Sequence, residues 1–149
     1  MSEKELLVRK IENGTVIDHI PAGLGLKVAN ILGIEKNSST SVILINVDSK
    51  KLGKKDVVKI ENKILDEKEA NKIALIAPDA TLNIVKDWEV VEKKKVSLPE
   101  FLEGVVRCPN KNCISNSEEI PAKFWAEKKN PIRLRCYYCE RVFGKDEVI

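Results

Sequence analysis

The chain has 149 residues, of which 43% are hydrophobic and 33% charged, and its formal net charge is +3. This composition is typical of a folded protein with a charged surface and excludes a low-complexity chain. No stretch reaches the roughly 20 apolar residues that a membrane span needs. The charged N-terminus, Met1 to Glu5, lacks the apolar core of a signal peptide. We therefore expect a soluble protein of the cytoplasm, where thiols stay reduced.

Two strands and a helix are predicted at the start of the chain. Residues 5–11 and 15–20 have the apolar and β-branched side chains of strands, and Asn13-Gly14 between them is a hairpin signal. A helix is predicted to begin after Pro21 and to end at Gly33. The apolar stripe of this helix consists of Leu24, Val28, Ile31 and Leu32.

The middle of the chain continues with alternating strands and a second helix. Residues 42–47 and 56–62 are predicted strands, and residues 67–76 are a predicted helix that Asp66 caps. A last strand, or a pair of strands, is predicted over residues 80–91. The order β-β-α-β-β-α-β predicts an α+β fold, in which two helices cover one face of a ferredoxin-like antiparallel sheet.

A linker is predicted at residues 92–99, because a run of charges and a proline favour an exposed crossing between domains. We therefore expect two domains, at residues 1–98 and 99–149. The second is too small to bury a large core of its own. Its predicted strands are short and lie at residues 105–107, 131–135 and 142–143.

Four cysteines, the only ones in the chain, lie in the second domain as two closely spaced pairs. Cys108 and Cys113 are separated by four residues, and Cys136 and Cys139 by two. Two such pairs about 20 residues apart are typical of a structural Zn²⁺ site. Short strands that enter and leave the pairs predict a small zinc-ribbon-like β domain. Four sulfur ligands leave no position for water or substrate, so the metal is predicted to stabilise the fold.

Three alternatives to this interpretation can be weighed from the residues alone. Two disulfides would need an oxidising compartment. A zinc enzyme would need an open coordination position, which four thiolates exclude. A zinc ribbon of a transcription or translation complex would bind nucleic acid through basic side chains. Residues 100–149 carry nine basic and eight acidic side chains, and four thiolates with one Zn²⁺ would make this domain slightly negative. This balance favours a protein partner.

A few polar residues of the first domain are candidates for a ligand site. Asp18 and His19 are adjacent in a predicted strand, so their side chains are expected to point to opposite faces. Lys59 projects from the sheet between two apolar neighbours. The lysine run at residues 93–95 is either a solvated linker or a source of phosphate contacts. Each of these signals is weak when it is taken alone.

Taken together, several motifs resemble the regulatory chain of aspartate carbamoyltransferase, in order and over nearly the whole chain. The resemblance implies a non-catalytic subunit whose N-terminal domain binds nucleotide effectors. In this family CTP, often with UTP, inhibits and ATP activates, and a zinc domain docks on a separate catalytic chain. Regulatory dimers bridge catalytic trimers in a dodecamer that controls pyrimidine biosynthesis. The motifs are residues 14–22, 55–62, 77–83, 97–100, 107–115 and 136–140.

The resemblance also implies roles for particular residues. Asp18 and Lys59 are expected to hold the ribose, and His19 and Lys93 the triphosphate, with Asn83 close by. In the zinc domain, the residues expected to contact the catalytic chain are Asn110, Asn112 and Glu140. Those expected to frame the base are Val8, Arg9, Ile11, Val85, Trp88 and Val90.

Two positions depart from the family pattern near the base. Trp88 stands where the family often has tyrosine, and Arg9 stands where better-known members are acidic. The larger ring and the changed charge are expected to alter the base pocket.

Overall fold

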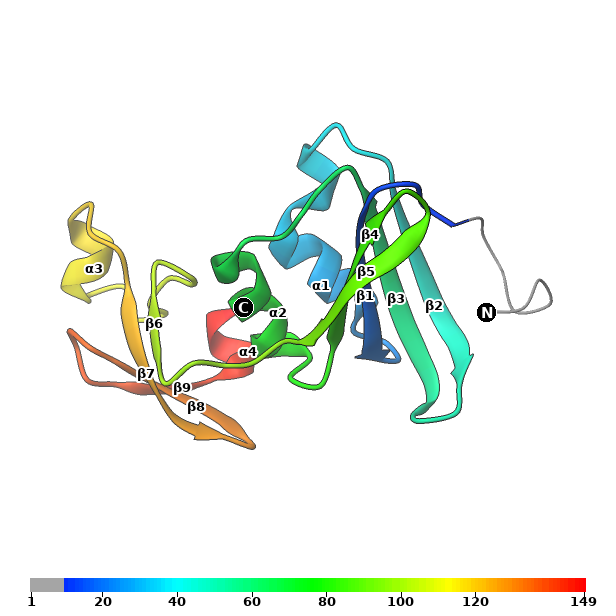
Figure 1. Cartoon of the computed structure of the whole chain (residues 1–149). Helices are drawn as coiled ribbons and strands as arrows, with labels where there is room; N and C mark the ends of the chain where they lie inside the picture. Colours follow the sequence, from blue (N-terminus) through cyan, green and yellow to red (C-terminus); the bar gives the residue numbers. More distant parts are fainter. Residues whose placement is uncertain (1–9) are drawn as a thin grey trace.

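The computed structural model describes residues 10–149, which form two antiparallel sheets in succession along the chain (Figure 1). Within these residues, no helix is long and apolar enough to cross a membrane. The first part consists of β1 (Gly14–Pro21), α1 (Gly25–Leu32), a 3₁₀ turn η2 (Ile34–Lys36), β2 (Ser41–Ser49), β3 (Gly53–Glu61), α2 (Glu67–Ile76), β4 (Thr81–Lys86) and β5 (Glu89–Lys95). The second part consists of β6 (Phe101–Glu103), α3 (Ile114–Ser117), β7 (Lys123–Lys129), β8 (Ile132–Cys136), β9 (Val142–Gly144) and α4 (Lys145–Val148).

The first sheet confirms the predicted α+β fold. Its strand order is β2-β3-β1-β4-β5, and every pair is antiparallel. The elements β1-α1-β2-β3-α2-β4 form the ferredoxin-like unit, to which β5 adds a strand beside β4. Helices α1 and α2 pack against each other on the face of the sheet that is turned toward the second sheet (Figure 1). The opposite face of the five-stranded sheet is free of helices among the described residues.

The hairpin predicted around Asn13-Gly14 is wrong for β1, because β1 pairs with β3 on one side and with β4 on the other. Glycine is required at position 14 for a reason other than a hairpin turn. Its φ is 143°, and a Cβ there would lie 2.1 Å from the carbonyl oxygen of Ile60, so the close approach of β3 requires glycine. The predicted strand at residues 5–11 lies mostly outside the described residues.

The predicted linker at residues 92–99 is also wrong in its first half. Strand β5 continues to Lys95, where the lysines lie on the sheet edge beside β4. The remaining residues are not an exposed crossing, because Val96 and Leu98 are buried. Buried apolar side chains from both sheets form one continuous cluster, which extends from Ile17 to Phe143. The second sheet is therefore packed against the first part of the chain.

The second sheet has four strands in the order β6-β7-β8-β9. The strands predicted at residues 131–135 and 142–143 correspond to β8 and β9. The strand predicted at residues 105–107 is wrong, because the chain bends there and β6 lies earlier. Strand β7 was not predicted, since most of its side chains are charged and only Phe124 and Ala126 show the apolar alternation.

The two helices of the first part begin in different ways. Asp66 and Glu69 form the capping box of α2: Asp66 accepts a hydrogen bond from the Glu69 backbone N–H at 2.8 Å, and Glu69 accepts one from the Asp66 N–H at 3.2 Å. Helix α1 has no capping side chain of its own. The buried carboxylate of Asp56, on β3, accepts hydrogen bonds there from Gly23 N–H at 3.0 Å and Gly25 N–H at 2.8 Å.

The same carboxylate fixes an irregularity in β2. The register of β2 against β3 shifts between Leu44 and Val47, and Asn46 has a φ of 60°. The other carboxylate oxygen of Asp56 accepts the Asn46 N–H at 3.0 Å. One buried side chain therefore holds the start of α1 and the bulge of the edge strand on the frame of β3.

We expect Gly25→Ala to destabilise the chain by about 1–3 kcal/mol, because overpacking a filled site has this cost. The new Cβ would lie 2.8 Å from the Asp56 Cβ and would displace its carboxylate from three N–H donors. The control is Gly144→Ala, whose Cβ would meet its nearest neighbours at 3.8 Å. Thermal unfolding of both variants measures the effect. Equal melting temperatures would contradict the role given to Asp56.

Candidate metal centre and anion-binding face

The four cysteine sulfurs converge on one point between the two knuckles, and all lie within 4.8 Å of one another. The Sγ atoms of Cys108 and Cys139 are 3.8 Å apart, and those of Cys113 and Cys136 are 3.7 Å apart. A tetrahedral Zn²⁺ with bonds of about 2.3 Å places its sulfur ligands about 3.8 Å from one another. The sulfurs therefore fit one zinc ion, and no disulfide joins the four cysteines.

Backbone hydrogen bonds shape both knuckles. In the first knuckle, Cys113 N–H donates to the Asn110 carbonyl at 3.0 Å, and the Asn116 side-chain amide donates to the carbonyls of Cys108 and Asn110 at 2.8 Å. The second knuckle is the turn between β8 and β9. There Glu140 has a φ of 63°, and its N–H donates to the Cys136 carbonyl at 3.0 Å.

The environments of the thiols differ. Burial raises the pKa of Cys108 and of Cys136. Burial also opposes ionisation of Cys139, but hydrogen bonds from the Arg141 backbone, the Asn110 side chain and the neighbouring thiols together outweigh it and lower its pKa to about 7. The Ser115 hydroxyl lies 3.1 Å from the Cys113 sulfur, where it can donate to a thiolate. Partners of this kind orient metal ligands.

The three predicted docking residues lie on these knuckles, but their side chains differ in how far they are available to a partner. Asn110 is partly used inside the first knuckle, where its side-chain oxygen accepts the Asn112 N–H at 3.1 Å. The side chains of Asn112 and Glu140 are exposed. The structure places all three residues next to the metal centre.

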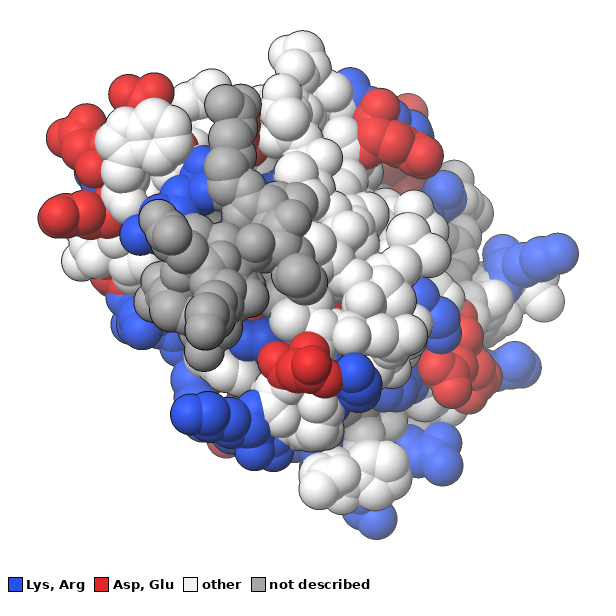
Figure 2. Space-filling model, turned by 90° about the vertical axis from the view of Figure 1, so that its right-hand side faces the viewer, with Lys and Arg blue, Asp and Glu red and all other residues white. Residues whose placement is uncertain are grey.

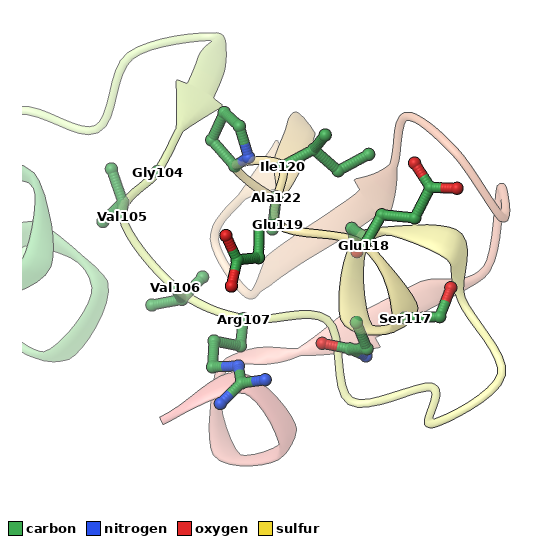
Figure 3. A pocket seen from close by; sticks show the side chains of 12 residues that line it. Gly104, Val105, Val106, Arg107, Ser117, Glu118, Glu119, Ile120 and Ala122 are labelled. Atoms are coloured by element: carbon green, nitrogen blue, oxygen red, sulfur yellow. The ribbon is translucent and has the colours of Figure 1, made fainter.

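A hollow of about 400 Å³ lies beside the first knuckle, between the segment that follows β6 and the one that follows α3 (Figure 3). Glu119 is turned toward the segment of Val106, and Glu118 points away from it. The lining includes two serines, but the Ser115 hydroxyl lies against the Cys113 sulfur and the Ser117 hydroxyl donates to the Ile114 carbonyl, so neither is paired with a lining glutamate as its base. This hollow therefore has no recognisable catalytic arrangement.

The first sheet gathers a second group of polar residues on its helix-free face. Directly paired residues share a face, and Lys59 pairs with Val16, Val16 with Asn83, and Asn83 with Lys93. Asp18 pairs with Thr81 on the same face. Figure 2 views the molecule from the side on which this sheet lies in Figure 1, and basic side chains gather there beside uncharged surface.

The expectation that Asp18 and His19 point to opposite faces is wrong. The register of β1 against β3 shifts between Ile17 and Ile20, and His19 has a φ of 58°. Asp18 accepts the His19 N–H at 2.6 Å, and the His19 Nδ1 lies 2.9 Å from the Thr81 hydroxyl. The bulge therefore turns both side chains to the helix-free face, and such bulges often lie beside functional sites.

Charge on this face is only partly balanced. Lys55 forms an ion pair with Asp18 at 2.8 Å. Burial lowers the pKa of Lys59, and the nearby Asp18 carboxylate partly offsets this effect. Lys93 and Lys95 pair with Asn83 and Thr81, so two further ammonium groups belong to the same face. An anion bound here would meet several cations, one of which is partly desolvated.

Residues with apolar side chains continue this face at its other end. Val85 pairs with Gly14 and Val90, four positions along β4 from Thr81, which is roughly 14 Å at about 3.4 Å per residue. Ile11 is buried before β1, and the backbone N–H of Trp88 donates to the Glu12 carbonyl at 2.9 Å in the β4–β5 turn. Val8 and Arg9 lie outside the described residues.

Three residues of this face were missed as site candidates: Lys55, Thr81 and Lys95. Side-chain alternation could have found them, since each lies two or four positions from Lys59, Asn83 or Lys93 in the same strand. The sequence motifs predicted only the residues that the family resemblance implies, and these are part of the face.

Two family models match the chain in succession: an allosteric domain over residues 6–97 and a metal binding domain over residues 100–149. The chain is therefore a regulatory, non-catalytic subunit. Both models describe the aspartate carbamoyltransferase regulatory chain, and the chain belongs to this family. The resemblance inferred from the motifs is confirmed, in place of a nucleic-acid-binding ribbon or a zinc enzyme.

Curated relatives agree over almost the full length. The chain is 54% identical over 147 residues to an aspartate carbamoyltransferase regulatory chain of Pyrococcus horikoshii, and 56% identical over 146 residues to one of Thermococcus gammatolerans. Each match covers 97% of both chains. The regulatory chain of Methanothermobacter thermautotrophicus is 52% identical, with 97% of this chain and 93% of that one covered.

We expect Ser115→Ala to weaken zinc binding by about tenfold or more, because it removes a donor to the Cys113 sulfur. The control is Ser117→Ala, whose hydroxyl donates at 3.2 Å to the Ile114 carbonyl. Competition with a chromophoric chelator measures both affinities. If the two variants bind zinc equally well, Ser115 does not support the metal.

Proposed function

We propose that the helix-free face of the first sheet binds nucleoside triphosphates and that the chain relays their effect to the catalytic chain. CTP, together with UTP, is the proposed inhibitor and ATP the proposed activator, in control of cytoplasmic pyrimidine biosynthesis. The observation that carries the proposal is the convergence of Asp18, His19, Lys59, Asn83 and Lys93 on one face, although they come from four strands.

Each part of this face suits one part of a nucleotide. Asp18 and Lys59 would hold the ribose, since a carboxylate accepts hydrogen bonds from hydroxyl groups and an ammonium donates to them. His19 and Lys93 would bind the triphosphate, with Asn83 beside them. Charged donors make the strong hydrogen bonds that a polyphosphate needs. Lys55 and Thr81 would orient Asp18 and His19, with which they interact.

The base would lie at the apolar end of the face. Val85 and Val90 are opposite each other there, and Ile11 and the β4–β5 turn with Trp88 are close by. Backbone N–H and C=O groups of residues 8–11 would distinguish the amino group of one base from the carbonyl of another. A pocket with apolar walls and a few polar groups is the usual design of a small-molecule site.

Packing behind the sheet supports a route from this site to the zinc domain. The face that carries the ligand residues is backed by Ile17, Val58 and Leu82, which belong to the continuous buried cluster. The C-terminal residue Ile149 lines a hollow together with Ile31 of α1 and Ile76 of α2. Coupling further requires that each effector favour one global state of the assembly.

The zinc domain would dock on the catalytic chain through residues on its knuckles: Asn110, Asn112 and Glu140. A preformed turn at Glu140 and an exposed Asn112 support this assignment, because both residues lie on the knuckles and their side chains remain accessible. Regulatory dimers would then bridge catalytic trimers in a dodecamer.

The dimer would form along β2. This strand is one of the two edges of the first sheet, and its sequence Ser-Val-Ile-Leu-Ile-Asn-Val is largely apolar, with Ile45 half exposed. The other edge, β5, carries five charged side chains. An apolar edge with unpaired backbone groups is a template for another strand, whereas charges prevent such pairing. A second copy of this chain is therefore the proposed occupant of the β2 edge.

We expect CTP and ATP to bind saturably to the zinc-loaded chain, and Lys93→Gln to weaken both by about tenfold or more. The control is Lys94→Gln, which removes the same charge from the next residue. Lys94 pairs with Leu82 and therefore belongs to the opposite face. Isothermal titration calorimetry measures the affinities. Absence of saturable binding, or equal losses in both variants, would contradict the proposed site.

A further inference from the structure

One face of the second sheet is exposed to solvent and carries large aromatic side chains. Phe101 of β6, Trp125 of β7, Arg135 of β8 and Val142 of β9 are directly opposite one another and so form a row across all four strands. The other face packs into the core through side chains that are at most 1% exposed: Leu102, Phe124 and Leu134. Among the described residues, nothing covers the row.

Aromatic rings make this exposed face continuous. Phe101 and Trp125 contact each other edge to face, with ring centroids 4.5 Å apart. Phe101 lies 6.3 Å from Tyr137, and Tyr137 lies 5.1 Å from Tyr138. Trp125 is 46% and Tyr137 51% exposed. Neighbouring large apolar groups left in water mark an interaction site, and Trp, Tyr and Arg are the residues that dominate binding energy in protein interfaces.

Two cations that lie among the aromatic rings are already paired within the chain. Lys123 lies 3.7 Å from Glu103 and beside the rings of Tyr137 and Tyr138, at 5.4 and 5.9 Å from their centroids. Arg135 forms an ion pair with Glu127 and donates to the Glu140 carbonyl at 3.2 Å. A nucleic acid needs unpaired cations for its phosphates, so the aromatic rings and the paired charges among them favour a protein.

We propose that this aromatic face is the main docking surface of the chain for the catalytic chain, with Trp125 as its anchor. The inference rests on the proposed function and extends the docking surface beyond the knuckle residues. Its support is continuity: Tyr137 lies inside the second knuckle between two zinc ligands, and Arg135 bonds to the backbone of Glu140. The metal centre therefore positions the aromatic face and the knuckle residues as one surface.

A second copy of this chain is the less suitable occupant. The apolar edge strand β2 already offers a surface for self-association in the other part of the chain. An aromatic face built around the metal centre adds a separate surface, and a regulatory subunit needs at least one surface for a different partner.

The test compares Trp125→Ala with Ile64→Ala, which truncates a side chain that is 55% exposed in the first part of the chain. Full-length, zinc-loaded variants are titrated with the purified catalytic chain. We expect Trp125→Ala to weaken docking at least tenfold, with zinc content and nucleotide affinity unchanged, and Ile64→Ala to leave docking intact. Trp125→Phe should restore most of the affinity, because it keeps an aromatic ring beside Phe101.

Wild-type docking affinity in Trp125→Ala would overturn the inference while leaving the proposed function in place. The inference also fails if this variant lowers self-association in sedimentation experiments and leaves docking unchanged, since the face would then join copies of this chain. If Trp125→Ala loses zinc, Trp125→Leu replaces it, because leucine keeps an apolar side chain on the strand without the ring, and unchanged docking affinity in that variant overturns the inference. Failure of the wild-type chain to bind the catalytic chain would instead refute the proposed function itself.

Discussion

Four sulfurs at the corners of one tetrahedron are the constraint on which the C-terminal part of the chain depends. Two knuckles that are far apart in sequence must place their sulfurs within 4.8 Å, and three of the four cysteines are buried. About fifty residues supply too little apolar surface for an independent core, so metal binding contributes directly to folding. Glu140 and Asn112 lie on the two knuckles that this centre joins.

The five-stranded sheet holds polar groups on one face, while its other face packs into the core. A bulge in β1 brings both Asp18 and His19 to the helix-free face, where β3, β4 and β5 add lysines and Asn83. The buried Asp56 carboxylate fixes α1 and β2 on the other side. The polar groups proposed to bind nucleotide and the groups that support the fold thus lie on opposite faces of the same strands, and the continuous core extends to the second sheet.

Much of this arrangement was predictable from local rules. Cysteine spacing predicted the metal centre, and Asp66 predicted the start of α2, because both depend on residues close in sequence. The pairing of β1 with β3 and β4 was missed, since Asn13-Gly14 is a hairpin signal and the close approach of Ile60 is non-local. The shared face of Asp18 and His19 depends on a bulge that strict alternation does not contain. The exposed aromatic row arises from strand register, which the sequence motifs do not define.

The central claim is that one part of the chain senses nucleotides and that another part, whose fold depends on the metal, docks on the catalytic chain. Removal of the metal tests this claim most directly. The full-length chain, before and after treatment with a strong chelator, is titrated with CTP and with the catalytic chain. The account predicts that the zinc-free chain loses docking and keeps its nucleotide affinity, because the proposed nucleotide face lies on the first sheet and the four sulfurs lie beside the second. Docking that survives zinc removal, or nucleotide binding that disappears with it, would contradict the account.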